Sequence, residues 1–265
     1  MNGRFTRLEF DEEGRRRQQR EEARMLEGTP PRNGAHFAAL ALESQQLGHF
    51  EKALQLYTRA VRDDRGLVQA WVGQVQMLVQ LGECAEARLW SDKALELFRD
   101  NGELLAAKAQ ACLRQGDLAS GTACSDASLR SPGMSPWRWE VRGEALLVRG
   151  ESLFRTCFQK AMAEPAADWF DHLVVAGILL FHGHAAAALE YAQQAVGLRA
   201  SHPYCWLVLG QCQASLGWND DAQITFNRCL ELTPRLDEAA RAIEALRRQS
   251  VLGRLARRMR SWFQR

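Results

Sequence analysis

The chain has 265 residues, a formal net charge of +2 at pH 7 and a hydrophobic content of 46%, which allows a large buried core. No window approaches the roughly 18 uninterrupted apolar residues that a membrane-spanning helix needs. Residues 1–27 are charged almost throughout and lack the apolar segment of a signal peptide. We therefore expect a cytoplasmic protein.

The seven cysteines support the same expectation. Their number is odd, and no two of them are spaced as Cys-x-x-Cys. This usage argues against a disulfide framework or a structural zinc site, and it suits a reducing compartment. Arginine outnumbers lysine by 30 to 4, which we interpret as the mark of a GC-rich, bacterial genome.

Charge is distributed unevenly along the chain. Residues 1–33 carry eight arginines and seven acids, and residues 247–265 carry seven arginines and no acid. The part between them, 34–246, is net acidic. The first segment has almost no apolar stripe, so we expect 1–33 to be a disordered or loosely helical leader, with a partner-binding arm as the alternative. Pro30 and Pro31 mark its end.

Six glycines then recur at steps of 34, 34, 34, 33 and 34 residues: Gly48, Gly82, Gly116, Gly150, Gly183 and Gly217. Each follows one amphipathic run and precedes another, as expected of a glycine that ends a helix in the left-handed conformation. A fixed period of this size indicates an array of helix-turn-helix repeats. The predicted repeats are 34–67, 68–101, 102–135, 136–168, 169–202 and 203–236.

The sixth repeat shows the pattern most completely, with Trp206, Leu209, Gly210, Ala222, Phe226 and Pro234. This pattern resembles the tetratricopeptide repeat, and the resemblance extends over 34–236. It implies an all-α fold, a right-handed α-solenoid of about six repeats in which no repeat buries its apolar face alone. We interpret the recurring tryptophans, Trp71, Trp139 and Trp206, as packing residues rather than ligand cages.

Two departures from the period stand out. The step of 33 residues places the missing residue just after Gly150, so that Phe154 falls where alanine usually sits and a local irregularity is expected in the fourth repeat. The alternatives are sequence drift and a bend that shapes a groove. The stretch 131–136 contains two prolines and a glycine, and we predict a hinge there between repeats 1–3 and 4–6.

A capping helix is predicted over 237–250, because a solenoid must cover its last apolar face. It is followed by a basic amphipathic tail, 251–265. The tail could dock on an anionic membrane surface at the inner face of a membrane, bind a partner as a helix, touch nucleic acid, or be a frayed end. The tail residues in question are Arg254, Arg257, Arg258, Arg260, Trp262 and Phe263.

Catalytic signatures are missing from the sequence, and we predict no enzyme activity, no cofactor and no metal site. His182 and His184 flank a turn glycine and could ligate a metal, but no third ligand is evident, and a solvated turn is the simpler interpretation. An enzyme or metal protein that uses these two histidines is the third hypothesis.

The resemblance implies that the first helix of each repeat lines a concave surface, through positions two, five, nine, twelve and thirteen. Ala38 and Leu42 stand where the carboxylate-clamp members of the family place lysine and asparagine, so that role is not predicted. The apolar candidates could equally pack against one another. The candidate groove residues are Gln69, Gln76, Gln80, Gln110, Arg114, Glu140, Glu144, Leu173, Leu180, Phe181, Tyr204 and Gln211.

The predicted function is a non-enzymatic scaffold or adaptor that binds a protein or peptide segment in this groove. The alternative is a peripheral membrane assembly factor anchored by the basic tail. Nucleic acid ranks last among the partners, because the repeat region is net acidic.

Overall fold

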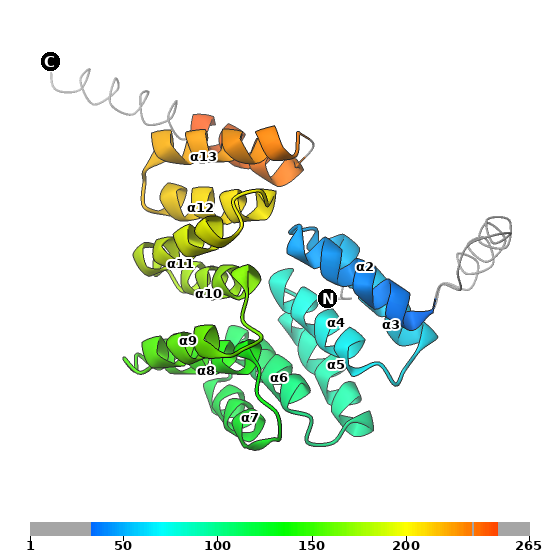
Figure 1. Cartoon of the computed structure of the whole chain (residues 1–265). Helices are drawn as coiled ribbons and strands as arrows, with labels where there is room; N and C mark the ends of the chain where they lie inside the picture. The colour runs from blue at the N-terminus through cyan, green and yellow to red at the C-terminus, as the bar shows by residue number, and fades with distance from the viewer. Residues whose placement is uncertain (1–32, 235, 249–265) are drawn as a thin grey trace, which may run out of the picture. The chain divides into compact units, whose positions relative to one another are not determined.

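The computed structural model describes residues 33–234 and 236–248, and all the regular secondary structure within these ranges is helical (Figure 1). The predicted leader, apart from Asn33, and the predicted tail 251–265 lie outside the described residues. The chain forms two compact units, Met1–Gly133 and Met134–Arg265. The division falls inside the stretch 131–136, from which the sequence predicts a hinge.

Between residues 33 and 133, the first unit contains three consecutive pairs of helices, in which the two helices of a pair are joined by a tight turn (Figure 1). The helices are α2 (Gly34–Gln46), α3 (Phe50–Asp63), α4 (Val68–Gln80), α5 (Cys84–Leu97), α6 (Gly102–Arg114) and α7 (Leu118–Arg130).

The second unit repeats this arrangement and adds a further helical segment, residues 237–248. Its pairs are formed by α8 (Pro136–Val148), α9 (Phe154–Ala163), α10 (Trp169–Phe181), α11 (Ala185–Leu198), α12 (Pro203–Ser215) and α13 (Asn219–Leu232). Leu236, just before this segment, and Ala239 and Ile243 within it are buried against Phe226 and its neighbours. The prediction of an all-α solenoid is confirmed.

The turn glycines reverse the chain within each pair. All six adopt φ between 74° and 85°, a region that costs a side-chain-bearing residue energy. At Gly82 the backbone N–H of Glu83 donates to the carbonyl of Leu78 at 2.9 Å, and the N–H of Gly82 donates to Val79 at 3.1 Å. These bonds satisfy carbonyls at the end of α4 and let α5 start at once.

Side chains cap the start of several first helices. The Asn101 Oδ1 atom accepts hydrogen bonds from the backbone N–H groups of Glu103 and Leu104, both at 3.1 Å, at the start of α6. Asp168 and Asp171 form a reciprocal capping box at the start of α10. Such contacts fix where each first helix begins, and hence which side chains reach its outer face.

Small residues allow the helices of a pair to approach closely. A Cβ atom added to Gly143 or Gly210 would collide with the ring of Phe158 or Phe226, respectively. Both rings are 1% exposed. The aromatic ring of the second helix therefore fills the space that the glycine of the first helix leaves open.

The predicted irregularity in the fourth repeat is present, and it takes the form of a shortened second helix. The helix α9 has 10 residues, and α11 and α13 have 14 each. It begins four residues after Gly150, whereas α11 and α13 begin two residues after their turn glycines. Its contact with α10 is also slight compared with that of α11 with α12.

Candidate functional site

The first helix of each pair divides its candidate positions between two faces. Positions two, nine and thirteen lie seven and four residues apart, so they share one side of the helix. On α4, α10 and α12 the residues at these positions are exposed or half-buried, whereas those at position five are buried. We call the outward residues of α4 the amide stripe. We call the outward residues of α10 and α12 the aromatic stripe.

The amide stripe consists of Gln69, Gln76 and Gln80, of which the first and last are exposed. Gln76 Oε1 accepts a hydrogen bond from Gln45 Nε2 at 3.4 Å, and Gln45 Oε1 accepts one from the Tyr57 hydroxyl at 2.8 Å. Burial raises the pKa of Tyr57, so its hydroxyl remains a donor. This chain of bonds holds the middle of the stripe in place and leaves its two ends free to meet a partner.

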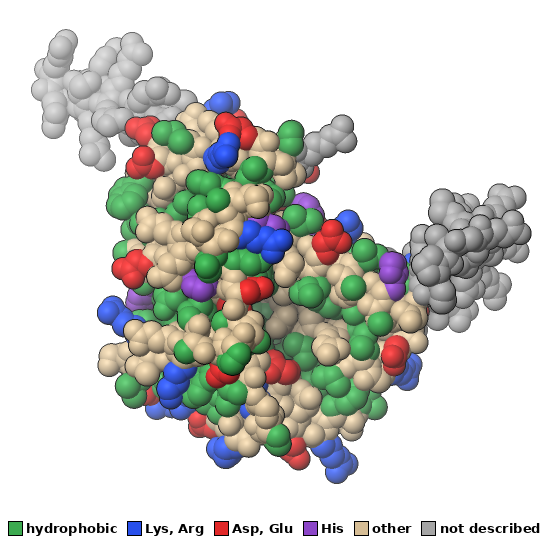
Figure 2. Space-filling model, viewed as in Figure 1, with side chains coloured by type: hydrophobic (Ala, Val, Ile, Leu, Met, Phe, Trp, Pro, Cys, Tyr) green, Lys and Arg blue, Asp and Glu red, His purple; other side chains and the backbone are tan. Residues whose placement is uncertain are grey.

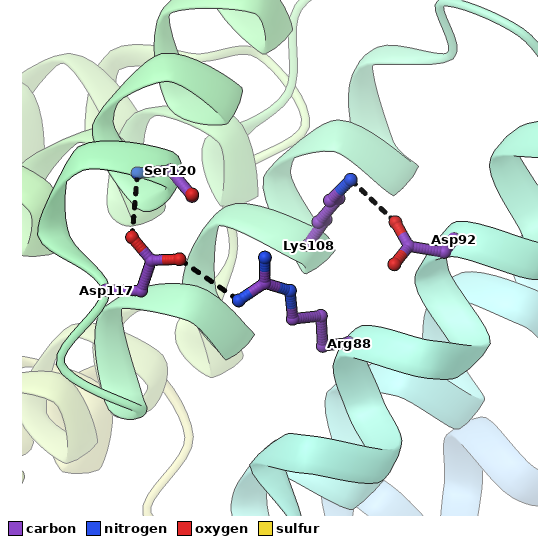
Figure 3. Close-up of polar contacts among 5 residues, drawn as sticks. All are labelled: Arg88, Asp92, Lys108, Asp117 and Ser120. Atoms are coloured by element: carbon purple, nitrogen blue, oxygen red, sulfur yellow. Dashed lines mark hydrogen bonds and ion pairs between the residues drawn. The ribbon is translucent and has the colours of Figure 1, made fainter.

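Two ion pairs join the second pair of helices to the third (Figure 3). Arg88 on α5 reaches Asp117 at the start of α7, at 3.0 Å, and Lys108 on α6 reaches Asp92 on α5, at 2.6 Å. Hydrogen bonds from Ser120 and then the Arg88 guanidinium lower the pKa of Asp117, whose carboxylate also caps α7. These contacts set the register of α6 against α5.

Two carboxylates on α8 are fully buried. Glu140 and Glu144 are each 0% exposed, and Glu144 Oε1 lies 2.9 Å from His182 Nε2 at the end of α10. Asp171, at the start of α10, lies close to the Glu140 side chain, and burial raises the pKa of this aspartate. These acids therefore tie α8 to α10 and are enclosed by the fold.

The aromatic stripe presents rings to solvent. Phe181 is 58% exposed, and the half-buried rings of Phe170 and Tyr204 lie 6.4 Å apart between their centroids. Gly177 lies between the two phenylalanines of α10, and a Cβ atom there would have nothing within 4 Å. Gln211 continues the stripe on α12 and is exposed. The surface thus combines apolar anchors with one amide and an accessible stretch of helix backbone.

The other predicted site residues fall into two groups. Arg114 and Leu180 are half-buried. Gln110, Glu140, Glu144 and Leu173 are at most 3% exposed, so they do not belong to the outward surface of the first helices. The family resemblance assigns them to the groove, whereas their burial depends on contacts with other helices. The tail candidates Arg254, Arg257, Arg258, Arg260, Trp262 and Phe263 lie outside the described residues.

The two histidines of the turn after α10 have different environments. His182 contacts Glu144, whereas the exposed His184 lies beside the ring of Phe154, at 6.2 Å between centroids. Within residues 33–234 and 236–248, no three histidine, cysteine or acidic side chains are grouped as a metal site would require. No helix in those ranges is both long enough and apolar enough to span a membrane.

Charge on the face drawn in Figure 2 is mixed. Basic and acidic side chains are interspersed there and do not gather into a patch of one charge.

One feature that the sequence did not reveal is a cavity of about 460 Å³ in the first unit, formed by α3, α4 and α5. Trp71, interpreted above as a packing residue, is buried but also lines this cavity. The sequence signal that could have indicated this cavity is a second tryptophan, Trp90, followed three residues later by a lysine, Lys93.

Two family models, both of the tetratricopeptide repeat, match the chain, one over residues 38–102 and the other over residues 203–236. No curated protein matches it significantly. A solved structure of a tetratricopeptide repeat protein from Parabacteroides merdae shares 15% identity, with 85% of this chain and 89% of that chain covered and a TM-score of 0.51. This likeness concerns the fold.

Two further solved structures have lower TM-scores. The Cut9–Hcn1 hetero-tetramer of the APC/C shares 13% identity, with 89% of this chain and 47% of that chain covered and a TM-score of 0.49. YrrB, a tetratricopeptide protein with an unusual peptide-binding site, shares 16% identity, with 71% and 97% covered and a TM-score of 0.40.

Proposed function

We propose, on the premise that this chain is a tetratricopeptide-like repeat protein, that it is a non-enzymatic adaptor that binds a segment of a partner protein. Solenoids of this kind present extended surfaces whose residues are spared from packing. The partner segment would lie across the outward sides of first helices.

The observation that carries the proposal is the aromatic stripe. Phe181 is a large apolar side chain that the fold leaves more than half exposed, and Phe170 and Tyr204 extend the apolar surface across two helices. Aromatic residues dominate the affinity of protein interfaces, because each buries a large area at a small cost in side-chain entropy. Gly177 leaves room for a partner side chain between the two phenylalanines.

The amide stripe on α4 provides a complementary kind of contact. Gln69 and Gln80 are exposed, and a glutamine side chain can donate to and accept from the backbone of an extended segment. Hydrogen bonds from these amides would orient the partner segment, while the apolar anchors would provide most of the affinity. We therefore expect a partner segment with apolar residues at its anchoring positions and few charges among them.

The test begins with selection of peptides on the purified full-length protein from a displayed random library. The affinity of a selected, fluorescently labelled peptide is then measured by anisotropy. Phe181→Glu should weaken binding about tenfold or more, because a charge replaces the anchor. The matched control is Ile224→Glu on α13, since Ile224 is 68% exposed and lies on a second helix. Equal affinity of both variants would refute the role of the stripe.

A second variant separates binding from folding. Gly177→Gln adds a side chain where nothing lies within 4 Å, so it should not disturb the fold. Replacement of a mid-helix glycine should raise the free energy of unfolding by up to about 1 kcal/mol. The added side chain should nevertheless obstruct the partner and lower its affinity. A stabilised variant with unchanged affinity would contradict the proposal.

The basic tail motivates a second candidate function, a peripheral membrane assembly factor at the inner face of a membrane. Its support is the sequence of 252–265, in which arginines alternate with Leu255, Met259, Trp262 and Phe263. The test is sedimentation of the full chain with vesicles of anionic lipid. Removal of 252–265 should abolish co-sedimentation, and binding that persists without the tail would refute this role.

A further inference from the structure

The cavity in the first unit lies away from the amide stripe. It has a volume of about 460 Å³ and opens between the later halves of α3 and α5 and the first half of α4. Gln74 and Trp71, which line it, project from α4 roughly opposite to Gln69 and Gln76, as 3.6 residues per turn requires. Its size falls within the range of sites that hold a small ligand or a few side chains of a peptide.

An amide with an unsatisfied atom forms part of the lining. Gln74 is 2% exposed, and its Oε1 atom has no hydrogen-bond partner. Buried polar atoms are almost always paired, because an unpaired atom has lost its water without compensation. Since the oxygen and nitrogen of an amide can exchange places by rotation, the tip of Gln74 can offer an acceptor to a ligand N–H group.

The wall is aromatic and already ordered. The rings of Trp71 and Trp90 lie 6.0 Å apart between centroids. The indole N–H of Trp71 donates to the carbonyl of Arg65 at 3.0 Å, and Lys93 Nζ lies 4.3 Å from the centre of the Trp90 ring. Because both rings are held by these contacts, the wall is formed before any ligand arrives. Val61 and Leu97 complete its apolar surface.

The charged lining residues favour an anion. Arg62, Arg65 and Lys93 line the cavity, against a single acid, Glu96. Arg62 and Arg65 are exposed side chains at the end of α3 and just beyond it, where they can reach a bound carboxylate. A ligand that fits must therefore combine an N–H donor, an apolar group and negative charge.

We propose that this cavity binds an acidic peptide segment with one apolar side chain. The apolar side chain would lie against Trp71 and Trp90, a backbone N–H would donate to Gln74, and flanking carboxylates would pair with Arg62, Arg65 and Lys93. The site rests on the proposed function in that the ligand belongs to a partner protein. The cavity lies on the side of α4 opposite the amide stripe. Unlike the stripes, it requires acidic residues in its ligand.

The probe is a labelled, terminally blocked Glu-Asp-Leu-Asp-Glu peptide, with anisotropy measured on the full chain. Arg65→Ser should weaken binding about fivefold and reduce its dependence on salt. Lys52→Gln is the matched control, because it removes one positive charge from an exposed position at the other end of α3. Equal weakening by both variants would reduce the effect to net charge and overturn the site.

Gln74→Leu keeps the test independent of folding. Leucine removes the unsatisfied amide, so the free energy of unfolding should stay the same or rise, while affinity for the peptide should fall about fivefold. Gln194→Leu, at an exposed position on α11 outside both stripes, should leave affinity unchanged. Unaltered affinity of the Gln74→Leu variant would overturn the proposal.

Two further arms identify the occupant. A Gln-Asn-Leu-Asn-Gln peptide should not bind, and a peptide of residues 20–28 of this chain should bind no more tightly than the acidic probe. Binding of the leader peptide alone would overturn the proposal in favour of an intramolecular contact. Phe181→Glu should leave affinity for the acidic peptide intact, so failure here and failure of the adaptor function are separate outcomes.

Discussion

The fourth and sixth pairs of helices share one central contact and differ in the length of the second helix. In both pairs an aromatic ring of the second helix covers a glycine of the first, Phe158 on Gly143 and Phe226 on Gly210. Around Phe226 the second helix has its full length of 14 residues, whereas around Phe158 it has 10. Loss of one residue from the period has therefore been absorbed at the start of the second helix, and the central contact has been kept.

The comparison indicates where a repeat can tolerate change. The ring-on-glycine contact sets how closely the helices of these two pairs cross, and both pairs retain it. The first turn of the second helix contributes less, because Phe154 takes over part of its role. The ring of this half-buried residue contacts Phe158, at 5.8 Å between centroids.

The largest expected effect comes from removal of the rings. Phe226→Ala should lower the free energy of unfolding by about 3–5 kcal/mol, because the ring lies in a closed core. Phe158→Ala should cost about 1 kcal/mol less than this, since the short α9 can move inward and fill part of the cavity. Chemical denaturation of the two variants measures the difference. A larger loss at Phe158 would show that the shortened helix is no easier to repack.

The second largest effect on stability is expected when each glycine is replaced by alanine, which adds a methyl group beneath each ring. Gly210→Ala and Gly143→Ala should each cost about 1–3 kcal/mol, because the new Cβ atom must displace a packed ring. Gly177→Ala is the control, since a Cβ atom there meets nothing within 4 Å. Phe158→Leu combined with Gly143→Ala should recover part of the loss. Full additivity of these two changes would argue that the ring and the glycine do not constrain each other.

The third effect is expected from an insertion that restores the regular period of the repeats. An alanine inserted between Ser152 and Leu153 should let α9 begin earlier, slow hydrogen exchange at residues 153–157, and raise the free energy of unfolding by about 1 kcal/mol. The same insertion between Trp218 and Asn219 lengthens a regular step, so it should destabilise the chain. A loss of stability in both cases would mean that the neighbours of α9 have adapted to the shorter helix.

The periodic features of the fold could be predicted from the sequence, because local chemistry dictates them. A turn glycine needs a positive φ wherever it ends a helix, so Gly48 or Gly217 predicts a turn without knowledge of its neighbours. The step of 33 likewise predicts an irregularity after Gly150. What spacing cannot give is the adjustment itself, since the place where α9 starts depends on how Phe154 packs.

The candidate site was less accessible to prediction. A helical wheel separates outward positions such as Gln80 from inward ones such as Leu173, both of which the family resemblance grouped together. The burial of Glu144 depends on His182, 38 residues away, and no local pattern reveals such a contact. The cavity beside Gln74 requires three helices, and a tryptophan that packs and a tryptophan that lines a cavity look alike in sequence.

The smallest expected effect concerns the helices that follow a shortened and a regular second helix. The α10 helix starts with the Asp168–Asp171 capping box, whereas α12 starts at Pro203 without a side-chain cap. Burial raises the pKa of Asp171, although the Asp168 backbone N–H opposes the shift. An acid with a raised pKa in the folded state favours folding while protonated, and this contribution is lost as pH rises through that pKa.

Asp171→Asn removes the titration but keeps an oxygen that can accept the capping bond. The variant should therefore gain stability relative to the parent chain as pH rises from 3 to 7, by less than about 1 kcal/mol, because Asp171 is only partly buried. The matched control is Asp237→Asn, a change at an exposed aspartate, over the same pH range. Denaturation at several pH values measures both. A difference that falls with rising pH would mean that ionised Asp171 stabilises α10, and that the cap outweighs the cost of burial.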